Sequence, residues 1–252
     1  MPKKTVIMLG AACLLCLGLF MAPAMAPAKS KPAAASPATV MFVLDASGSM
    51  WGQVKGKAKI QIAKEVMAKL ADGLPDDIRV GLSAYGHRRK GDCNDIETLI
   101  KPGSLNRAAV KAKVNAINPK GKTPLSEAVR RAAGELRYTE EKATVVLVSD
   151  GLETCHADPC ALAEELAKAG VDFTVHVIGF AISKDEQERL RCLADRTGGL
   201  FLSADAADGL LAALKKPVAK VKEPPKPVKQ DPGKATLQGP DQVPVGQAFE
   251  GQ

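Results

Sequence analysis

The chain has 252 residues, a formal net charge of +7, 46% hydrophobic residues and 4% aromatic residues. Its apolar content excludes a wholly disordered chain, and its few aromatic residues argue against a stacking platform for single-stranded nucleic acid. The excess of lysine lies in residues 1–38 and 215–234, whereas residues 39–214 are balanced in charge, so we expect no nucleic-acid partner.

Residues 1–26 are predicted to be a secretory signal peptide. Lys3 and Lys4 precede an apolar run over residues 5–21, and the small residues Ala24 and Ala26 suit cleavage by a signal peptidase. An exported chain would reside in the periplasm, in the cell envelope or outside the cell. If the segment stays uncleaved it would serve as a membrane anchor, the only membrane contact that we expect.

Residues 27–37 read as a low-complexity linker, after which strand and helix patterns alternate. Strand patterns cover residues 39–44, 78–85, 97–100, 144–148, 173–178 and 200–202. Helix patterns cover residues 60–70, 105–117 (entered through Ser104), 124–136, 161–169, 186–194 and 206–214. The alternation predicts an α/β domain over residues 38–214, with a doubly wound, mostly parallel six-stranded sheet, helices on both faces and residues 97–100 at an edge.

The sequence beyond residue 214 changes character. Residues 215–234 are rich in Lys and Pro and predict a semi-rigid linker. Residues 235–252 resemble the opening strand of an Ig-like β-sandwich. We interpret them as a partial, β-strand-like tail, either a vestige of such a module or the start of a truncated one.

An oxygen-rich motif follows the first buried strand directly. Asp45, Ser47 and Ser49 are spaced by two, so in an extended loop their side chains project to one side. One carboxylate and two hydroxyls are hard ligands that suit Mg²⁺, Mn²⁺ or Ca²⁺ better than zinc or copper. The same residue types also serve as helix N-caps, so the motif alone does not decide between the two roles.

Two further oxygen donors are expected at the same edge of the sheet. Asp150 follows the second strongly apolar strand, and Thr123 lies in a loop just before a predicted helix. Ligands of doubly wound sheets sit at the carboxyl ends of the strands. Three loops therefore supply one candidate set of metal ligands.

This combination of residues resembles the von Willebrand factor type A domain with its metal-ion-dependent adhesion site, in a bacterial exported form. The resemblance covers roughly residues 38–214, and no position of the motif departs from the family pattern: Asp45, Ser47, Ser49, Thr123 and Asp150. It implies a Rossmann-like fold with one antiparallel edge strand. It also implies a divalent cation, Mg²⁺ first and Mn²⁺ or Ca²⁺ as alternatives, held directly or through water.

The resemblance further implies how such a site works. The protein ligands leave a coordination position open for an Asp or Glu side chain of a partner protein. Trp51, the only tryptophan, stands beside the motif. It is either a local anchor of the loop or an exposed contact for that partner.

Four cysteines remain after the predicted signal peptide, namely Cys93, Cys155, Cys160 and Cys192. An even number in an exported chain favours two disulfides, with three possible pairings, over a zinc site that would use His156. The places of these cysteines in the expected fold favour Cys93–Cys155 and Cys160–Cys192, which would pin the loops that frame the ion.

Enzymatic alternatives are weaker. Phosphoryl-transfer enzymes of the haloacid dehalogenase type also have an Asp after the first strand, in the motif D-x-D. The second acid of that motif falls where this chain has Ser47. A metal-dependent hydrolase or phosphatase using the same ion is the alternative function, and it needs a general base. Glu153 is the nearby candidate and is expected to face solvent. We therefore predict a non-catalytic, metal-dependent adhesion or scaffold module that binds a protein.

Overall fold

A computed structural model describes residues 38–221. The predicted signal peptide, the 27–37 linker and the 235–252 tail lie outside the described residues, as does the Lys/Pro-rich segment from residue 222 on. Within residues 38–221, no helix combines the length and the apolar character needed to cross a membrane.

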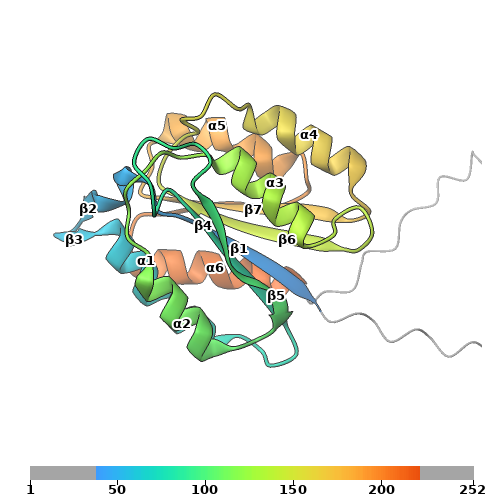
Figure 1. The fold of residues 1–252 in the computed structure, drawn as a ribbon, viewed down its shortest axis with the longest axis horizontal. Helices are drawn as coiled ribbons and strands as arrows, with labels where there is room; N and C mark the ends of the chain where they lie inside the picture. Colours follow the sequence, from blue (N-terminus) through green and yellow to red (C-terminus); the bar gives the residue numbers. More distant parts are fainter. Residues whose placement is uncertain (1–37, 222–252) are drawn as a thin grey trace, which may run out of the picture. The chain divides into compact units, whose positions relative to one another are not determined.

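The domain is built on a six-stranded sheet with the strand order β5-β4-β1-β6-β7-β8 (Figure 1). The strands are β1 (Thr39–Asp45), β4 (Arg79–Tyr85), β5 (Ile96–Ser104), β6 (Ala143–Ser149), β7 (Phe173–Phe180) and β8 (Phe201–Ala204). Only β5 pairs antiparallel, at one edge, so the predicted fold class is confirmed. A short antiparallel hairpin, β2 (Gln53–Val54) and β3 (Lys57–Ala58), follows β1.

Helices cover both faces of the sheet. One face carries α1 (Lys59–Gly73), α2 (Arg107–Ala116) and α6 (Ala207–Val221), and the other carries α3 (Leu125–Glu135), α4 (Pro159–Ala169) and α5 (Lys184–Asp195). The strand β1 shows why the sheet needs both layers. Its residues Val40, Phe42 and Leu44 pack into the first core, and Met41 and Val43 pack into the second.

Several helix boundaries differ from the sequence prediction, and two of them have a clear physical reason. Ser104 ends β5, and α2 begins after Asn106, whose side-chain oxygen accepts a hydrogen bond from the Ala109 amide at 2.9 Å. The helix α6 continues past Leu214 to Val221, so the start of the predicted linker is wrong. Val218 and Val221 are buried and extend the apolar face of α6, and this packing offsets the backbone hydrogen bond lost at Pro217.

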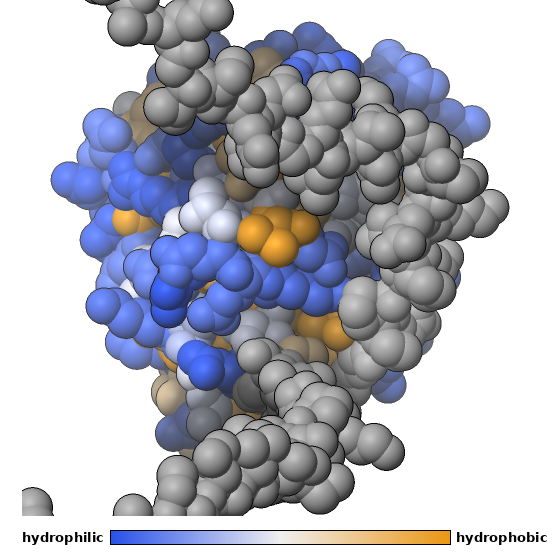
Figure 2. Space-filling view, turned by 90° about the vertical axis from the view of Figure 1, so that its right-hand side faces the viewer, coloured by the Kyte–Doolittle hydropathy of each residue, from blue (hydrophilic) through white to orange (hydrophobic). Residues whose placement is uncertain are grey.

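Figure 2 shows the domain from the side away from the β2–β3 hairpin. In the coloured part of this view, hydrophilic residues predominate and apolar residues form small, separate spots. Scattered apolar spots of this kind are normal on a folded domain and mark no interaction site by themselves.

His176 lies in β7 and is predicted to destabilise the fold in acid. Its Nδ1 accepts a hydrogen bond from the Leu200 amide at 2.9 Å, and burial, followed by the charge of Lys220, lowers the pKa of His176 from 6.5 to about 4. Between these two pH values the unfolded chain binds a proton that the folded chain excludes. The contribution of His176 to the free energy of unfolding should therefore fall as the pH drops from 6.5 to 4, by up to about 3 kcal/mol.

The test is urea unfolding of His176→Asn and of the wild type at neutral pH and near pH 4. The asparagine oxygen can still accept the Leu200 amide, so the variant should lose less stability in acid. His156→Asn, an exposed site, is the matched control. Equal acid sensitivity of all three proteins would show that His176 does not contribute.

Candidate metal centre

Three loops meet at the carboxyl edge of the sheet, beside the β2–β3 hairpin in Figure 1. The parallel strands β1 and β6 are neighbours, so Asp45 at the end of β1 and Asp150 just after β6 emerge side by side. The third loop joins through Ser47 and Gly121, which form an isolated parallel bridge, and the Gly48 amide donates to the Gly121 carbonyl at 3.0 Å.

Close backbone packing at this edge requires glycine at two positions. The Gly121 amide donates to the Gly86 carbonyl at 2.8 Å, and a Cβ on Gly121 would lie 2.5 Å from the Arg89 carbonyl oxygen. Gly86 has a φ of +70°, a conformation that side chains disfavour. The loop that carries Thr123 is therefore held against the ends of both β1 and β4.

Four of the five predicted ligands form one continuous set of hydrogen bonds. The Asp45 Oδ1 atom accepts the Ser47 amide at 2.8 Å, and the Ser47 and Ser49 hydroxyls lie 2.9 Å apart. Ser49 Oγ then donates to Asp150 Oδ1 at 2.6 Å. The oxygen-bearing side chains of two loops, distant in sequence, thus converge on a single point.

The fifth predicted ligand, Thr123, is buried in the adjoining loop. Its amide donates to Thr154 Oγ1 at 2.8 Å, and its carbonyl accepts the Thr154 amide at 3.1 Å. These bonds tie the Thr123 loop to the loop that follows Asp150.

The sequence reasoning missed the groups that support Asp45. The Asp45 Oδ2 atom accepts the Ser149 hydroxyl at 2.7 Å, and Ser149 in turn accepts the Tyr85 hydroxyl at 3.2 Å. Burial and the nearby Asp45 carboxylate raise the pKa of Tyr85, which keeps the phenol protonated as a donor. These contacts fix the orientation of the Asp45 carboxylate before any ligand arrives.

The electrostatics of the centre favour the arrival of a cation. Asp45 is fully buried, and burial together with the Asp150 carboxylate raises its pKa from 3.8 to about 6. Lys59, also missed, forms an ion pair with Asp150, with Nζ 3.0 Å from Oδ2. The centre thus holds two buried carboxylates and one ammonium, so one negative charge remains uncompensated in a low-dielectric environment.

The donor set fits a small, hard divalent cation. It consists of carboxylate and hydroxyl oxygens, which are ligands of the kind that Mg²⁺ and Ca²⁺ take. Among the described residues, no group of three or more His, Cys, Asp or Glu side chains is placed to hold a metal. A metal bound at this centre would therefore need the serine and threonine hydroxyls as ligands beside the two carboxylates.

Glu153 does not face solvent as the sequence prediction had it. Its Oε1 atom accepts the Cys155 amide at 2.7 Å, and its Oε2 atom accepts the Ser126 amide at 2.9 Å. The carboxylate thereby satisfies a free amide at the start of α3 and fixes the loop after Asp150. Both of its oxygens are engaged with the backbone, which disfavours the role of a general base.

Trp51 is anchored and exposed at the same time. Its Nε1 donates to the Pro119 carbonyl at 3.0 Å, which anchors the Asp45 loop to the Thr123 loop. Trp51 is nevertheless 50% exposed. An anchored but exposed ring is a rigid surface contact, which costs little entropy on binding.

The structure contains both disulfides in the predicted pairing. Cys93–Cys155 joins the loop after β4 to the loop after Asp150, and Cys160–Cys192 joins α4 to α5. The first bridge closes a segment with a sequence separation of 62 residues, for which chain entropy gives a stabilisation of about 4 kcal/mol. It pins two of the loops that surround the candidate ligands.

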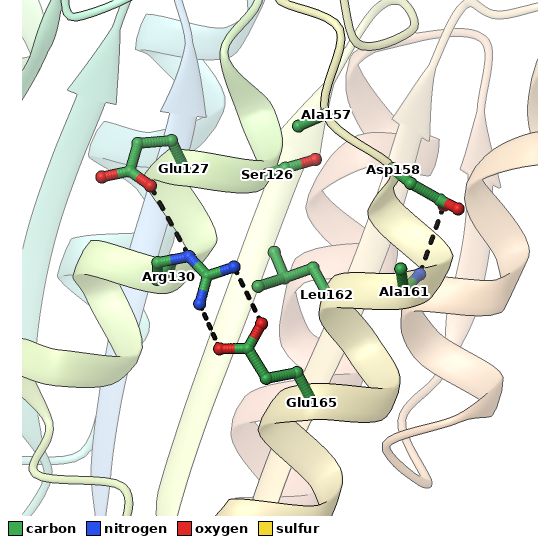
Figure 3. Close-up of a pocket in the computed structure, with 8 residues that line it drawn as sticks. All are labelled: Ser126, Glu127, Arg130, Ala157, Asp158, Ala161, Leu162 and Glu165. Carbon is green, nitrogen blue, oxygen red and sulfur yellow. Dashed lines mark hydrogen bonds and ion pairs between the residues drawn. The ribbon is translucent and has the colours of Figure 1, made fainter.

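A cavity of about 240 Å³ lies between α3 and α4 (Figure 3). Arg130 is paired there with both Glu127 and Glu165, and Asp158 caps α4 through the Ala161 amide. These charged groups of the cavity are therefore engaged with one another or with the backbone. None of the five predicted ligands lines it, so it is separate from the candidate metal centre.

The chain is similar to proteins of a known domain family. The von Willebrand factor type A domain family matches residues 40–153. YwmC of Bacillus subtilis (strain 168) is 33% identical over 191 residues, which make up 72% of this chain and 83% of YwmC.

Two solved structures share the fold at low sequence identity. BatB from Bacteroides thetaiotaomicron has a TM-score of 0.58 and 19% identity, over 72% of this chain and 97% of BatB. The pilus adhesin SpaC from Lactobacillus rhamnosus GG has a TM-score of 0.59 and 16% identity, over 72% of this chain and 30% of SpaC. The chain belongs to the von Willebrand factor type A domain family.

Proposed function

We propose that this protein is a non-catalytic, metal-dependent protein-binding module that works outside the cytoplasm. The observation that carries the proposal is the chain of contacts from Asp45 through Ser47 and Ser49 to Asp150. Such a set of oxygens, fixed by the fold and partly uncompensated in charge, is suited to holding a divalent cation. Mg²⁺ is the first candidate, and Mn²⁺ or Ca²⁺ are alternatives.

The five residues Asp45, Ser47, Ser49, Thr123 and Asp150 would hold the ion. When bound, the ion would offer a coordination position to an Asp or Glu side chain of the partner protein. The adjoining loops carry three exposed lysines, Lys90, Lys120 and Lys122. None of them forms an ion pair with an acidic residue among the described residues. Their charge would attract an acidic surface and repel a basic one.

Two other observations support this function. SpaC, which shares the fold, is a pilus adhesin, and binding to another protein or surface is the kind of activity we propose here. The two disulfides support a place outside the cytoplasm, because such bonds persist in oxidising compartments. The alternative, a hydrolase, is disfavoured because both oxygens of Glu153 are engaged with backbone amides.

The proposal is tested by affinity capture from an envelope extract. Wild-type protein with Mg²⁺ should retain a partner that is lost when a chelator is added and lost in Asp45→Ala. The control variant Asp76→Ala removes a carboxylate that is 89% exposed, and it should capture the partner normally. Partners retained equally by all samples would remove the ion from the mechanism. Turnover of phosphate esters that is lost in Asp45→Ala would instead support the hydrolase.

A further inference from the structure

Lys59 occupies an unusual position in the candidate metal centre. It is the first residue of α1, and its ammonium crosses to the loop after β6, where it pairs with Asp150 Oδ2 at 3.0 Å. It also donates to the Ala181 carbonyl at 3.2 Å. The Lys59 side chain is 14% exposed and that of Asp150 is 0% exposed, so water screens this pair weakly.

The place of Lys59 on its helix is locally unfavourable. The amino end of a helix carries partial positive charge, which favours Asp or Glu there and disfavours Lys. The first turn of α1 holds no acidic residue, and no side chain caps its first amides. The ammonium of Lys59 thus lies at a helix end that disfavours positive charge. Asp150 and the Ala181 carbonyl are the groups that compensate this charge.

The net charge of the candidate metal centre depends on Lys59. Asp45 and Asp150 supply two negative charges, and Lys59 supplies one positive charge in direct contact with Asp150. A dication added to this set would leave the centre with an excess of positive charge. Without Lys59, the two carboxylates alone would neutralise the dication.

We propose that Lys59 sets the charge of the centre, weakening its hold on the metal and strengthening its attraction for an anionic group of the partner. The inference rests on the proposed function, since it concerns the same ion. Lys59 is a positioning residue here, because its ammonium touches Asp150 and acts on the ion through it. The positive charge of Lys59 lowers the affinity of the centre for the metal ion and raises the affinity of the metal-loaded centre for an anionic group.

The test compares Lys59→Met and Lys59→Gln with the wild type by calorimetric titration of Mn²⁺. Removing one positive charge beside a buried ligand should tighten Mn²⁺ binding roughly tenfold. Lys59→Gln keeps a hydrogen-bond donor toward Asp150, so it provides the same comparison if the methionine variant folds poorly. Lys57→Met is the matched control, because Lys57 is exposed and pairs with Glu65 at the surface, and it should bind Mn²⁺ like the wild type.

A second titration uses acetate as a probe of the anionic ligand. Acetate displaces water from protein-bound Mn²⁺, which lowers the water proton relaxation rate, and this response should require several-fold more acetate in both Lys59 variants. Weaker or unchanged Mn²⁺ binding in both variants would overturn the inference while leaving the proposed function intact. A wild type that binds no divalent cation would instead overturn the proposed function.

Discussion

Asp45→Asn is expected to stabilise the metal-free protein near neutral pH and to abolish its stabilisation by divalent cations. Burial and the Asp150 carboxylate raise the pKa of Asp45 from 3.8 to about 6, so the ionised group costs about 3 kcal/mol in the metal-free fold. Asparagine removes this charge and keeps an oxygen that can accept the Ser47 amide. The free energy of unfolding with chelator present should therefore rise by about 2 kcal/mol.

The response to metal should change in the opposite direction. A cation that binds only the folded wild type stabilises it by about 2.7 kcal/mol at a concentration one hundred times its dissociation constant. Asp45→Asn lacks the charge that holds the ion, so its unfolding curve should be the same with Mg²⁺ and with chelator. If Asp45→Asn is more stable than the wild type but gains nothing from Mg²⁺, the Asp45 carboxylate serves metal binding and destabilises the metal-free fold.

Urea unfolding with Mg²⁺ and with chelator measures both effects on the same samples. Asp76→Asn removes an exposed carboxylate of the same charge and should resemble the wild type in both conditions. If Asp45→Asn is less stable than the wild type with chelator present, the hydrogen bonds to the Asp45 carboxylate outweigh the cost of burying its charge. If the variant still gains stability from Mg²⁺, the ion binds elsewhere.

The parts of the centre that could be predicted from the sequence share one property. Asp45 and Asp150 directly follow the two most apolar strands, and in a parallel sheet the ends of neighbouring strands lie together. The order of these strands, and not any local contact, brings the two carboxylates to one point. The same reasoning anticipated the pairing of Cys93 with Cys155, because both cysteines lie in loops at that edge.

The residues that escaped prediction act through contacts that leave no trace in their own segment. Lys59 and Asp150 are 91 positions apart, and nothing beside Lys59 in the sequence indicates an acidic partner. Ser149 is an ordinary strand residue until its hydroxyl is seen to lie between Tyr85 and Asp45. Long side chains and strand ends find their partners through tertiary packing, which periodicity and spacing do not encode.

The fold boundaries show a related limit. Pro217 and the lysines around it predicted a linker, yet α6 continues to Val221. Local propensity disfavours Pro within a helix by about 3 kcal/mol, and the burial of Val218 and Val221 supplies a stabilisation of similar size. Only the docking of α6 on the sheet decides between these two contributions, and the sheet is formed by residues far away in the sequence.

Metal affinity is expected to fall by about tenfold between neutral pH and about pH 5. The cation needs the ionised form of Asp45, and a pKa of about 6 means that most of the metal-free protein is protonated there at pH 5. The sign follows from the raised pKa. In the metal-free fold this group favours folding below pH 3.8 and loses that contribution as the pH rises through 6, whereas a bound cation stabilises the fold most at high pH.

Calorimetric titration of Mn²⁺ at several pH values checks this dependence. A plot of the logarithm of the affinity against pH should bend near pH 6 and fall with a slope of about one below it. His176 is buried in β7 and its pKa of about 4 lies below this bend, so His176→Asn should leave the curve near pH 6 unchanged. A bend near pH 4 would mean that Asp45 behaves as an ordinary carboxylate, and that the neighbouring Asp150, balanced by Lys59, does not oppose its ionisation. The pH at which the affinity bends thus reports how strongly burial and the neighbouring Asp150 carboxylate oppose the ionisation of Asp45.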